Sequence, residues 1–181
     1  MGAGQATDED LVLALRRGDV SAFETLYRRY ERRLFGYVLR QVPERSRAED
    51  LFQDVFFKVL SDSTFDPERG RFSAWLFTVA RNRCLMEARK EHTREDKAHL
   101  AAPMRPIADP EAELGEAARV RQAMAGLSET QRQLLMLKQV GELTYREIAS
   151  VLGVAEGTIK SRLHVATKAF RQRLAELGEG S

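Results

Sequence analysis

The stretch that decides the fold is YREIASVLGVAEGTIKSRLHVATKAFRQRL, residues 145–174. Counted from Tyr145, apolar side chains fall at the fourth, eighth, tenth and fifteenth positions: Ile148, Leu152, Val154 and Ile159. Ala149 is fifth, where a larger side chain would push a second helix away. Gly153 is ninth, where a tight turn favours positive φ. The spacing predicts a helix-turn-helix, although an ordinary amphipathic helical hairpin shares part of this pattern.

The second helix of this motif separates apolar from basic residues when projected at about 100° per residue from Thr158. Its apolar side comprises Ile159, Leu163, Ala166, Phe170 and Leu174. Its opposite side comprises Lys160, Ser161, His164, Lys168 and Arg171. We expect the early members of the polar side to enter a DNA major groove and the last two to lie near phosphates.

Charge is unevenly distributed along the 181 residues, although the formal net charge is only +2. Residues 81–94 and 156–173 are basic, with net charges of +3 and +4, whereas residues 95–120 have a net charge of −3. Two basic segments suggest two contacts with a polyanion, although solvated helix faces have the same composition. Three prolines in the acidic segment (Pro103, Pro106 and Pro110) predict a tether at 95–111.

Length and motif content exclude several classes of protein. A chain of this length forms one or two small domains, and its single cysteine, Cys84, excludes an intramolecular disulfide framework. No apolar run approaches the ~20 residues of a membrane helix, and no signal peptide opens the chain, so we expect a soluble cytoplasmic protein. The sequence contains no HExxH, CxxC or GxxxxGK[ST] motif, so we expect neither an enzyme nor a metal or other cofactor.

Helix-capping signals recur along the whole chain. Thr7 or Asp8 precedes a helix that ends before Gly18, and capping boxes begin at Ser46, Ser128 and Thr144. No hairpin dipeptide or sustained period-2 alternation appears. The predicted fold is all-α, with two small helical domains at 8–94 and 112–178 joined by a flexible linker at 95–111.

The predicted helix AEDLFQDVFFKVL, residues 48–60, carries an aromatic residue on its polar face. On a wheel of ~100° steps, Phe57 falls among Asp50, Gln53 and Asp54, opposite the apolar face. Such an aromatic suggests a protein-partner site. A single exposed phenylalanine is also common, so both interpretations remain open.

The next segment, FDPERGRFSAWLFTVARN at residues 65–82, places aromatics beside basic residues. Trp75 and Asn82 are seven residues apart and share a helix face. Aromatic and basic side chains together suit single-stranded nucleic acid, whose bases stack on rings while phosphates contact Arg and Lys. For Trp75 itself, packing in the hydrophobic core explains an aromatic residue at this position at least as well as base stacking does.

Taken together, the chain resembles a bacterial RNA polymerase sigma factor of the extracytoplasmic-function group. The resemblance extends from about residue 10 to 177. It is carried by the two segments quoted above and by AFETLYRRYERRLFGYVLR (22–40) and LSETQRQLLMLKQVGELTYREIASVLGVAEGTIKSRL (127–163). It implies that the first domain, sigma region two, binds the polymerase beta-prime coiled coil and captures the melted −10 element. The second domain, sigma region four, binds the beta flap and recognises the −35 element of promoter DNA.

The resemblance also assigns residues to three contacts and implies an anti-sigma partner. The core polymerase contact comprises Asp50, Gln53, Asp54 and Phe57. The −10 contact comprises Phe65, Arg71, Phe72, Trp75 and Asn82. The −35 contact comprises Thr158, Lys160, Ser161, Arg162, His164 and Lys168.

The chain departs from the family pattern at a few positions. Asp54 stands where the family often has Glu. Ala155 stands where the family often has an N-capping Ser, and Val165 and Thr167 stand where it often has Arg, so the −35 contacts should be weaker or retuned. A helix-turn-helix regulator with an N-terminal sensor domain is the main alternative, and pulldown with core polymerase would distinguish the two.

Overall fold

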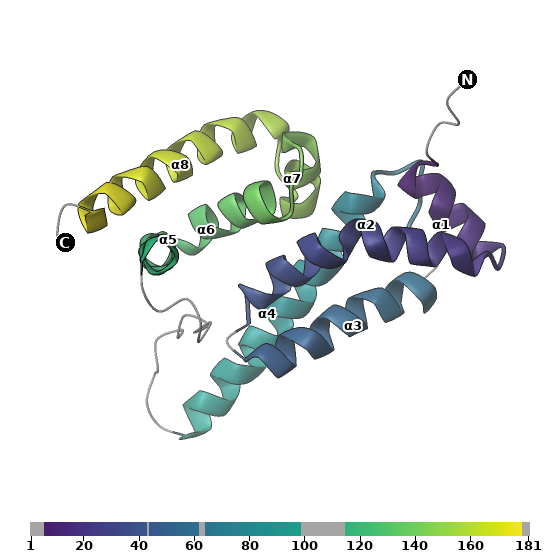
Figure 1. The fold of residues 1–181 in the computed structure, drawn as a ribbon, viewed down its shortest axis with the longest axis horizontal. Helices are drawn as coiled ribbons and strands as arrows, with labels where there is room; N and C mark the ends of the chain where they lie inside the picture. The colour runs from purple at the N-terminus through teal and green to yellow at the C-terminus, as the bar shows by residue number, and fades with distance from the viewer. Residues whose placement is uncertain (1–5, 43, 62–63, 99–114, 179–181) are drawn as a thin grey trace.

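The structure, a computed structural model, describes residues 6–42, 44–61, 64–98 and 115–178, with the side chains of residues 91–98 and 117 outside the description. Its elements are helical and are drawn in Figure 1. They are α1 (Asp8–Arg16), α2 (Val20–Leu39), α3 (Arg45–Ser61), α4 (Phe72–Ala98), α5 (Glu116–Ala125), α6 (Glu129–Leu135), the π-helix η1 (Met136–Val140), α7 (Tyr145–Leu152) and α8 (Glu156–Gly178). No strand occurs in these ranges, so the all-α prediction is confirmed for the part of the chain that they cover.

The N-terminal domain is a bundle in which α2 packs against α1 and α3, and α3 packs against α4. Thr7 caps α1: its side chain accepts from the Asp10 N–H, while the Asp10 carboxylate accepts from the Thr7 N–H. The turn after α1 contains Gly18 at φ +94°, a conformation that glycine adopts without steric cost. Both the predicted cap and the predicted end of this helix are confirmed.

The start of α3 differs from the prediction. We expected Ser46 to open a capping box, but the helix begins at Arg45, so Ser46 lies inside the first turn. Its hydroxyl donates to the Glu44 carboxylate over 2.7 Å, and the Ala48 N–H bonds the Glu44 carbonyl oxygen. The capping prediction at Ser46 is therefore wrong, because the chain enters the helix before the serine.

The C-terminal domain contains α5 to α8, with α8 packed on α5, α6 and α7. Ser128 and Thr144 form the two predicted capping boxes, with Gln131 and Glu147 as their partners. Gly141 is the C-cap of η1, with φ −72°, outside the left-handed region. A Cβ there would lie 2.8 Å from the Leu137 carbonyl oxygen and 3.0 Å from the Phe77 ring, so the glycine permits a close approach.

Helix α4 is longer than the sequence indicated. We expected the tether to begin at residue 95, but the helix continues to Ala98. The proline-containing part of the predicted tether falls within residues 99–114, outside the described residues.

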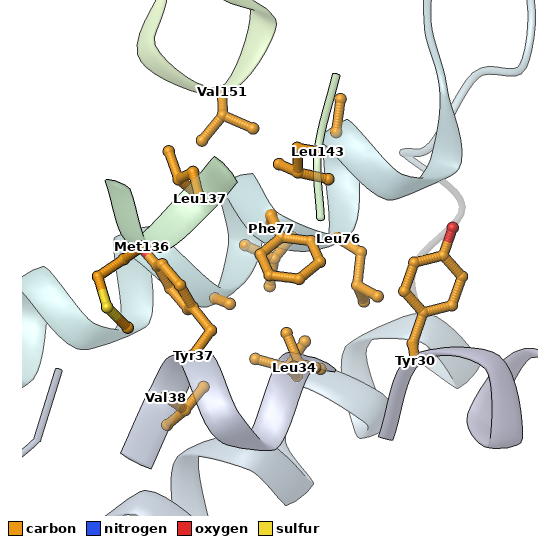
Figure 2. Packing of buried hydrophobic residues seen from close by; sticks show 14 of the residues in the cluster. Tyr30, Leu34, Tyr37, Val38, Leu76, Phe77, Met136, Leu137, Leu143 and Val151 are labelled. Atoms are coloured by element: carbon orange, nitrogen blue, oxygen red, sulfur yellow. The ribbon is translucent and has the colours of Figure 1, made fainter. Parts of the chain in front are cut away.

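The hydrophobic cores of the two domains are continuous. Figure 2 shows Phe77 of α4 between Leu34 of α2 and Leu137 and Leu143 of the C-terminal domain. All four side chains are fully buried. The two sets of helices therefore pack directly on each other across the elements α2, α4, η1 and α7.

Candidate nucleic-acid interface

Helices α7 and α8 form a helix-turn-helix with the geometry that the sequence predicts. Gly153 ends α7 in the left-handed region, at φ +67°, and its N–H bonds the Ala149 carbonyl oxygen. Ile148 and Ile159 are fully buried between the helices, and the small side chain of Ala149 lies in the same core. The motif thus fixes α8 against α7 and leaves the opposite side of α8 open.

The open side of α8 carries polar and basic groups. The exposed residues among the predicted −35 contacts are Lys160, Ser161, Arg162, His164 and Lys168. Thr158 is half-buried, and its carbonyl oxygen accepts from the Ser161 hydroxyl over 3.1 Å. Every residue of this predicted set except Thr158 is therefore exposed on one helix. The helix begins at Glu156, directly after Ala155, whose side chain offers no acceptor to the first amides.

Asn82 is exposed on α4 beside two arginines with defined partners. Arg81 donates from Nε to Gln133 Oε1 over 3.2 Å, and Arg83 lies 3.4 Å from the Asp54 carboxylate. Asn82 itself is exposed, and the arginines before and after it in the sequence both have partners. An amide can donate to and accept from a base edge, so Asn82 is well suited to bind an unpaired base.

Two of the predicted base-contacting aromatics lie in the core. Phe65 and Phe72 are 3% and 1% exposed, and their ring centroids are 5.6 Å apart. Phe72 also packs edge-on against Tyr30 at 5.4 Å. Neither ring offers a face to a base in this conformation. The two rings fill the space between the loop before α4 and the helix bundle.

The other members of the predicted −10 contact lie nearer to the surface. Trp75 is half-buried, with its ring 5.7 and 5.8 Å from those of Phe65 and Phe72. Arg71 is exposed, and its guanidinium lies 3.5 Å from the Glu9 carboxylate. Glu9 also accepts from the Phe72 N–H at the start of α4. The aromatic cluster therefore supports this end of α4, and its exposed groups are Arg71 and part of Trp75.

A separate surface on α3 carries the aromatic that the helical wheel placed among polar groups. Phe57 is 64% exposed, and Asp50, Gln53 and Asp54 are exposed on the same helix. Leu60, one turn further on, is 51% exposed, and our sequence analysis did not identify it. The spacing of three residues between Phe57 and Leu60 could have indicated that the two side chains share one face of the helix. The two side chains give α3 an apolar patch beside carboxylates.

Clusters of potential metal ligands were sought in the part of the chain that the structure describes. No group of three or more His, Cys, Asp or Glu side chains that could hold a metal ion is found there. Burial raises the pKa of the Cys84 thiol to about 12, so this cysteine stays protonated and unreactive at neutral pH. In the same ranges, no helix has the length and apolar character needed to span a membrane.

Comparison with known proteins agrees with the geometry. Residues 26–94 match the model of Sigma-70 region 2, and residues 117–170 match that of Sigma-70, region 4. The extracytoplasmic-function (ECF) RNA polymerase sigma factor RpoE of Cereibacter sphaeroides is 35% identical over 160 residues, which cover 87% of this chain and 88% of the relative. The chain belongs to the ECF sigma factors. SigK of Mycobacterium tuberculosis, also an ECF sigma factor, is 33% identical over 175 residues, covering 91% of this chain and 94% of SigK.

Two solved structures share this fold. RpoE of Bartonella quintana, in complex with the anti-sigma factor NepR, matches with a TM-score of 0.66 and 25% identity, covering 84% of this chain and 96% of that one. CnrH, in complex with the cytosolic domain of CnrY, matches with a TM-score of 0.68 and 23% identity over 96% and 99% of the two chains. In this sigma factor, helices α2 to α4 fall wholly or partly within residues 26–94, which match region 2. Helices α5 to α8 fall wholly or partly within residues 117–170, which match region 4.

Proposed function

We propose that this sigma factor divides promoter recognition between two surfaces, with α8 of region four on duplex −35 DNA and the Asn82 face of α4 on the melted −10 element. The observation that carries the proposal is the helix-turn-helix whose basic outer face stays exposed, in one chain with a region-two domain that presents Asn82. The domains that we assign to these tasks are 8–94 and 112–178, with a linker between them.

The −35 contact follows from the direction in which α8 presents its side chains. A helix inserted in the major groove places residues of its N-terminal half at base edges. Lys160, Ser161 and His164 occupy that half and offer hydrogen-bonding groups. Arg162 and Lys168 contribute positive charge nearer to the phosphates, where contacts strengthen binding to DNA of any sequence. Val165, exposed on the same helix, adds an apolar surface where the family often has arginine.

The −10 contact rests on Asn82, Arg71 and the exposed part of Trp75. Capture of an unpaired base requires hydrogen-bonding groups for its edge or a flat side chain for its face. Asn82 supplies the first and Trp75 the second, while Arg71 can contact a phosphate. Phe65 and Phe72 act indirectly in this proposal, because they hold Trp75 and the start of α4 in place.

The core polymerase contact is the patch on α3 formed by Phe57, Asp50, Gln53 and Asp54. An exposed aromatic surrounded by polar groups has the composition of an interface anchor with a polar rim. We assign this patch to the beta-prime coiled coil and region four to the beta flap.

Regulation by an anti-sigma factor is the remaining part of the proposal. The similar protein RpoE of Bartonella quintana was solved with the anti-sigma factor NepR. We place the protein in the cytoplasm, with core RNA polymerase and promoter DNA, and assign it no catalytic activity or cofactor of its own.

Binding to linear and pre-melted promoter templates tests this division of labour. Lys160→Ala should weaken holoenzyme binding to linear duplex promoter DNA by about 1–3 kcal/mol if Lys160 contacts a base, and should matter less on a template with a pre-melted −10 bubble. Asn82→Ala should spare duplex binding but impair open-complex formation, and it should still weaken binding to the bubble. If Asn82→Ala behaves like wild type on both templates, Asn82 does not contact the −10 element.

A further inference from the structure

The outer face of α8 carries an apolar side chain among its polar groups. Val165 is 56% exposed, and Ser161 and Lys168, one turn away on either side, are exposed as well. Figure 1 shows α8 along the outer edge of region four. A β-branched residue is a poor helix former, and this one buries little of its surface within the domain. The fold therefore gains little from valine at this position.

The helical projection places Val165 on the side of α8 that faces away from the core. The buried side of α8 is formed by Ile159, Leu163 and Ala166. On a wheel of ~100° steps from Thr158, these residues centre near ~110°, so the opposite direction lies near ~290°. Val165 falls at ~340°, as near to that direction as His164 at ~240° and nearer than Lys160 at ~200°. A groove that admits the polar readers therefore also receives Val165.

Two small residues on the same face allow α8 to approach a groove closely. Gly157 and Ser161 fall at ~260° and ~300° on this wheel. A Cβ on Gly157 would meet no other described atom within 4 Å, so packing inside the protein does not require glycine there. The Ser161 hydroxyl donates to the Thr158 carbonyl oxygen over 3.1 Å, which keeps this side chain against its own helix. Neither residue holds the helix away from DNA, so the methyl groups of Val165 can reach base edges.

The chemistry of valine determines which base it favours. In the major groove, thymine presents a C5-methyl group, whereas the other three bases present polar atoms without a methyl group. Valine has no hydrogen-bonding group in its side chain, so it would desolvate polar base atoms without giving them a partner. Its χ1 angle has one strongly preferred value in a helix, so little rotamer freedom is lost on contact. Thymine is therefore the base that suits this position.

We propose that Val165 selects a base pair containing thymine in the −35 element, by packing its methyl groups against the C5-methyl group of that base. The proposal rests on the assignment of α8 to the −35 element above and adds a specificity-determining residue to it. An arginine at this position, which the family often has, would instead donate to O6 and N7 of guanine. The valine thus gives this sigma factor a base preference of its own.

Selection of DNA by the holoenzyme tests the predicted preference. Core polymerase with the full-length protein should be incubated with linear duplexes randomised over both promoter elements, and the bound DNA should be sequenced. Wild type should select a −35 motif in which thymine predominates at one position, and Val165→Ala should lose the preference at that position alone. Val165→Arg should select guanine there. The matched control is Val20→Ala, which shortens the 69% exposed valine of α2 and should select the wild-type motif.

Uracil substitution then tests the methyl contact itself. Uracil keeps the hydrogen-bonding groups of thymine but lacks its methyl group, so it should replace each thymine of the selected motif in turn. At the position that Val165 contacts, uracil should weaken wild-type binding about fourfold, the change expected for one buried methyl group. The same uracil should leave the binding of Val165→Ala unchanged, because that variant has already lost the contact. Its unfolding midpoint should be no lower than that of wild type, since alanine favours helix.

The outcomes separate this proposal from the function on which it rests. Lys160→Ala should weaken binding to the selected duplex whether the DNA carries thymine or uracil. If it does so, but uracil has no effect at any position or weakens wild type and Val165→Ala equally, the role of Val165 is refuted and the −35 contact stands. If the holoenzyme selects no −35 motif, the assignment of α8 and the role of Val165 both fail.

Discussion

Replacing Phe57 with alanine should weaken core polymerase binding about thirtyfold without affecting the fold. The side chain is 64% exposed, so roughly 130 Å² of its ~200 Å² surface is available to a partner. At about 25 cal/mol per Å², burial of that area contributes at most about 3 kcal/mol. The cost of ordering and desolvating the surrounding polar groups reduces this to about 2 kcal/mol, which corresponds to a thirtyfold change in Kd.

Competition with a fluorescently labelled sigma factor for core polymerase measures this effect directly. Val20→Ala is the matched control, because Val20 is 69% exposed but lies on α2 and not among the predicted contact residues of α3. Thermal unfolding should place both variants within about 0.5 kcal/mol of wild type. If folded Phe57→Ala protein binds core within about twofold of wild type, Phe57 is only a surface residue and the assignment of α3 is wrong.

Two further predictions concern the helix-turn-helix and its contact with region two. Burial raises the pKa of the Glu147 carboxyl, but hydrogen bonds from Ser73 and Thr144 outweigh it and leave the pKa below its ordinary value. A carboxylate with a lowered folded-state pKa stabilises the fold above its unfolded pKa near 4.5 and loses that contribution as the pH falls through the folded value. The midpoint of thermal unfolding should therefore fall less between pH 6 and pH 3.5 in Glu147→Gln than in wild type, and equal falls would refute this role. Gly153→Ala should destabilise the protein by about 1–2 kcal/mol, because its φ of +67° disfavours a Cβ although no atom obstructs one. Gly157→Ala, in open space on α8, should be neutral or stabilising in the same denaturation assay, and equal effects of the two substitutions would contradict the argument from φ.

The local part of the structure was predictable because it depends on neighbours in the sequence. The spacing of Ile148, Ala149, Gly153 and Ile159 predicted the helix-turn-helix, whose core the structure confirms. The capping boxes at Ser128 and Thr144 were confirmed for the same reason, since cap and partner are three residues apart. The helical wheel likewise predicted that Phe57 faces away from the core.

Features that depend on distant segments were predicted less well. The sequence places Phe65 and Phe72 beside basic residues, but only the packing of the loop against Tyr30 and α4 shows that both rings are buried. Gly141 follows a helix, which suggested a C-cap, whereas the constraint on it comes from Phe77, 64 residues earlier in the chain. A Cβ on Gly36 of α2 would lie 3.3 Å from a methyl group of Val140, and no pattern local to Gly36 indicates this approach.

Transcription with purified components tests the central claim most directly. Core polymerase should be incubated with fragmented genomic DNA of the source organism, with or without the protein, and the 5′ ends of the transcripts should be sequenced. We expect the protein to produce a set of start sites, each preceded by the same two-part motif at the −10 and −35 positions, that core polymerase alone does not produce. Transcripts identical with and without the protein, under conditions in which it is folded and bound to core, would contradict the account.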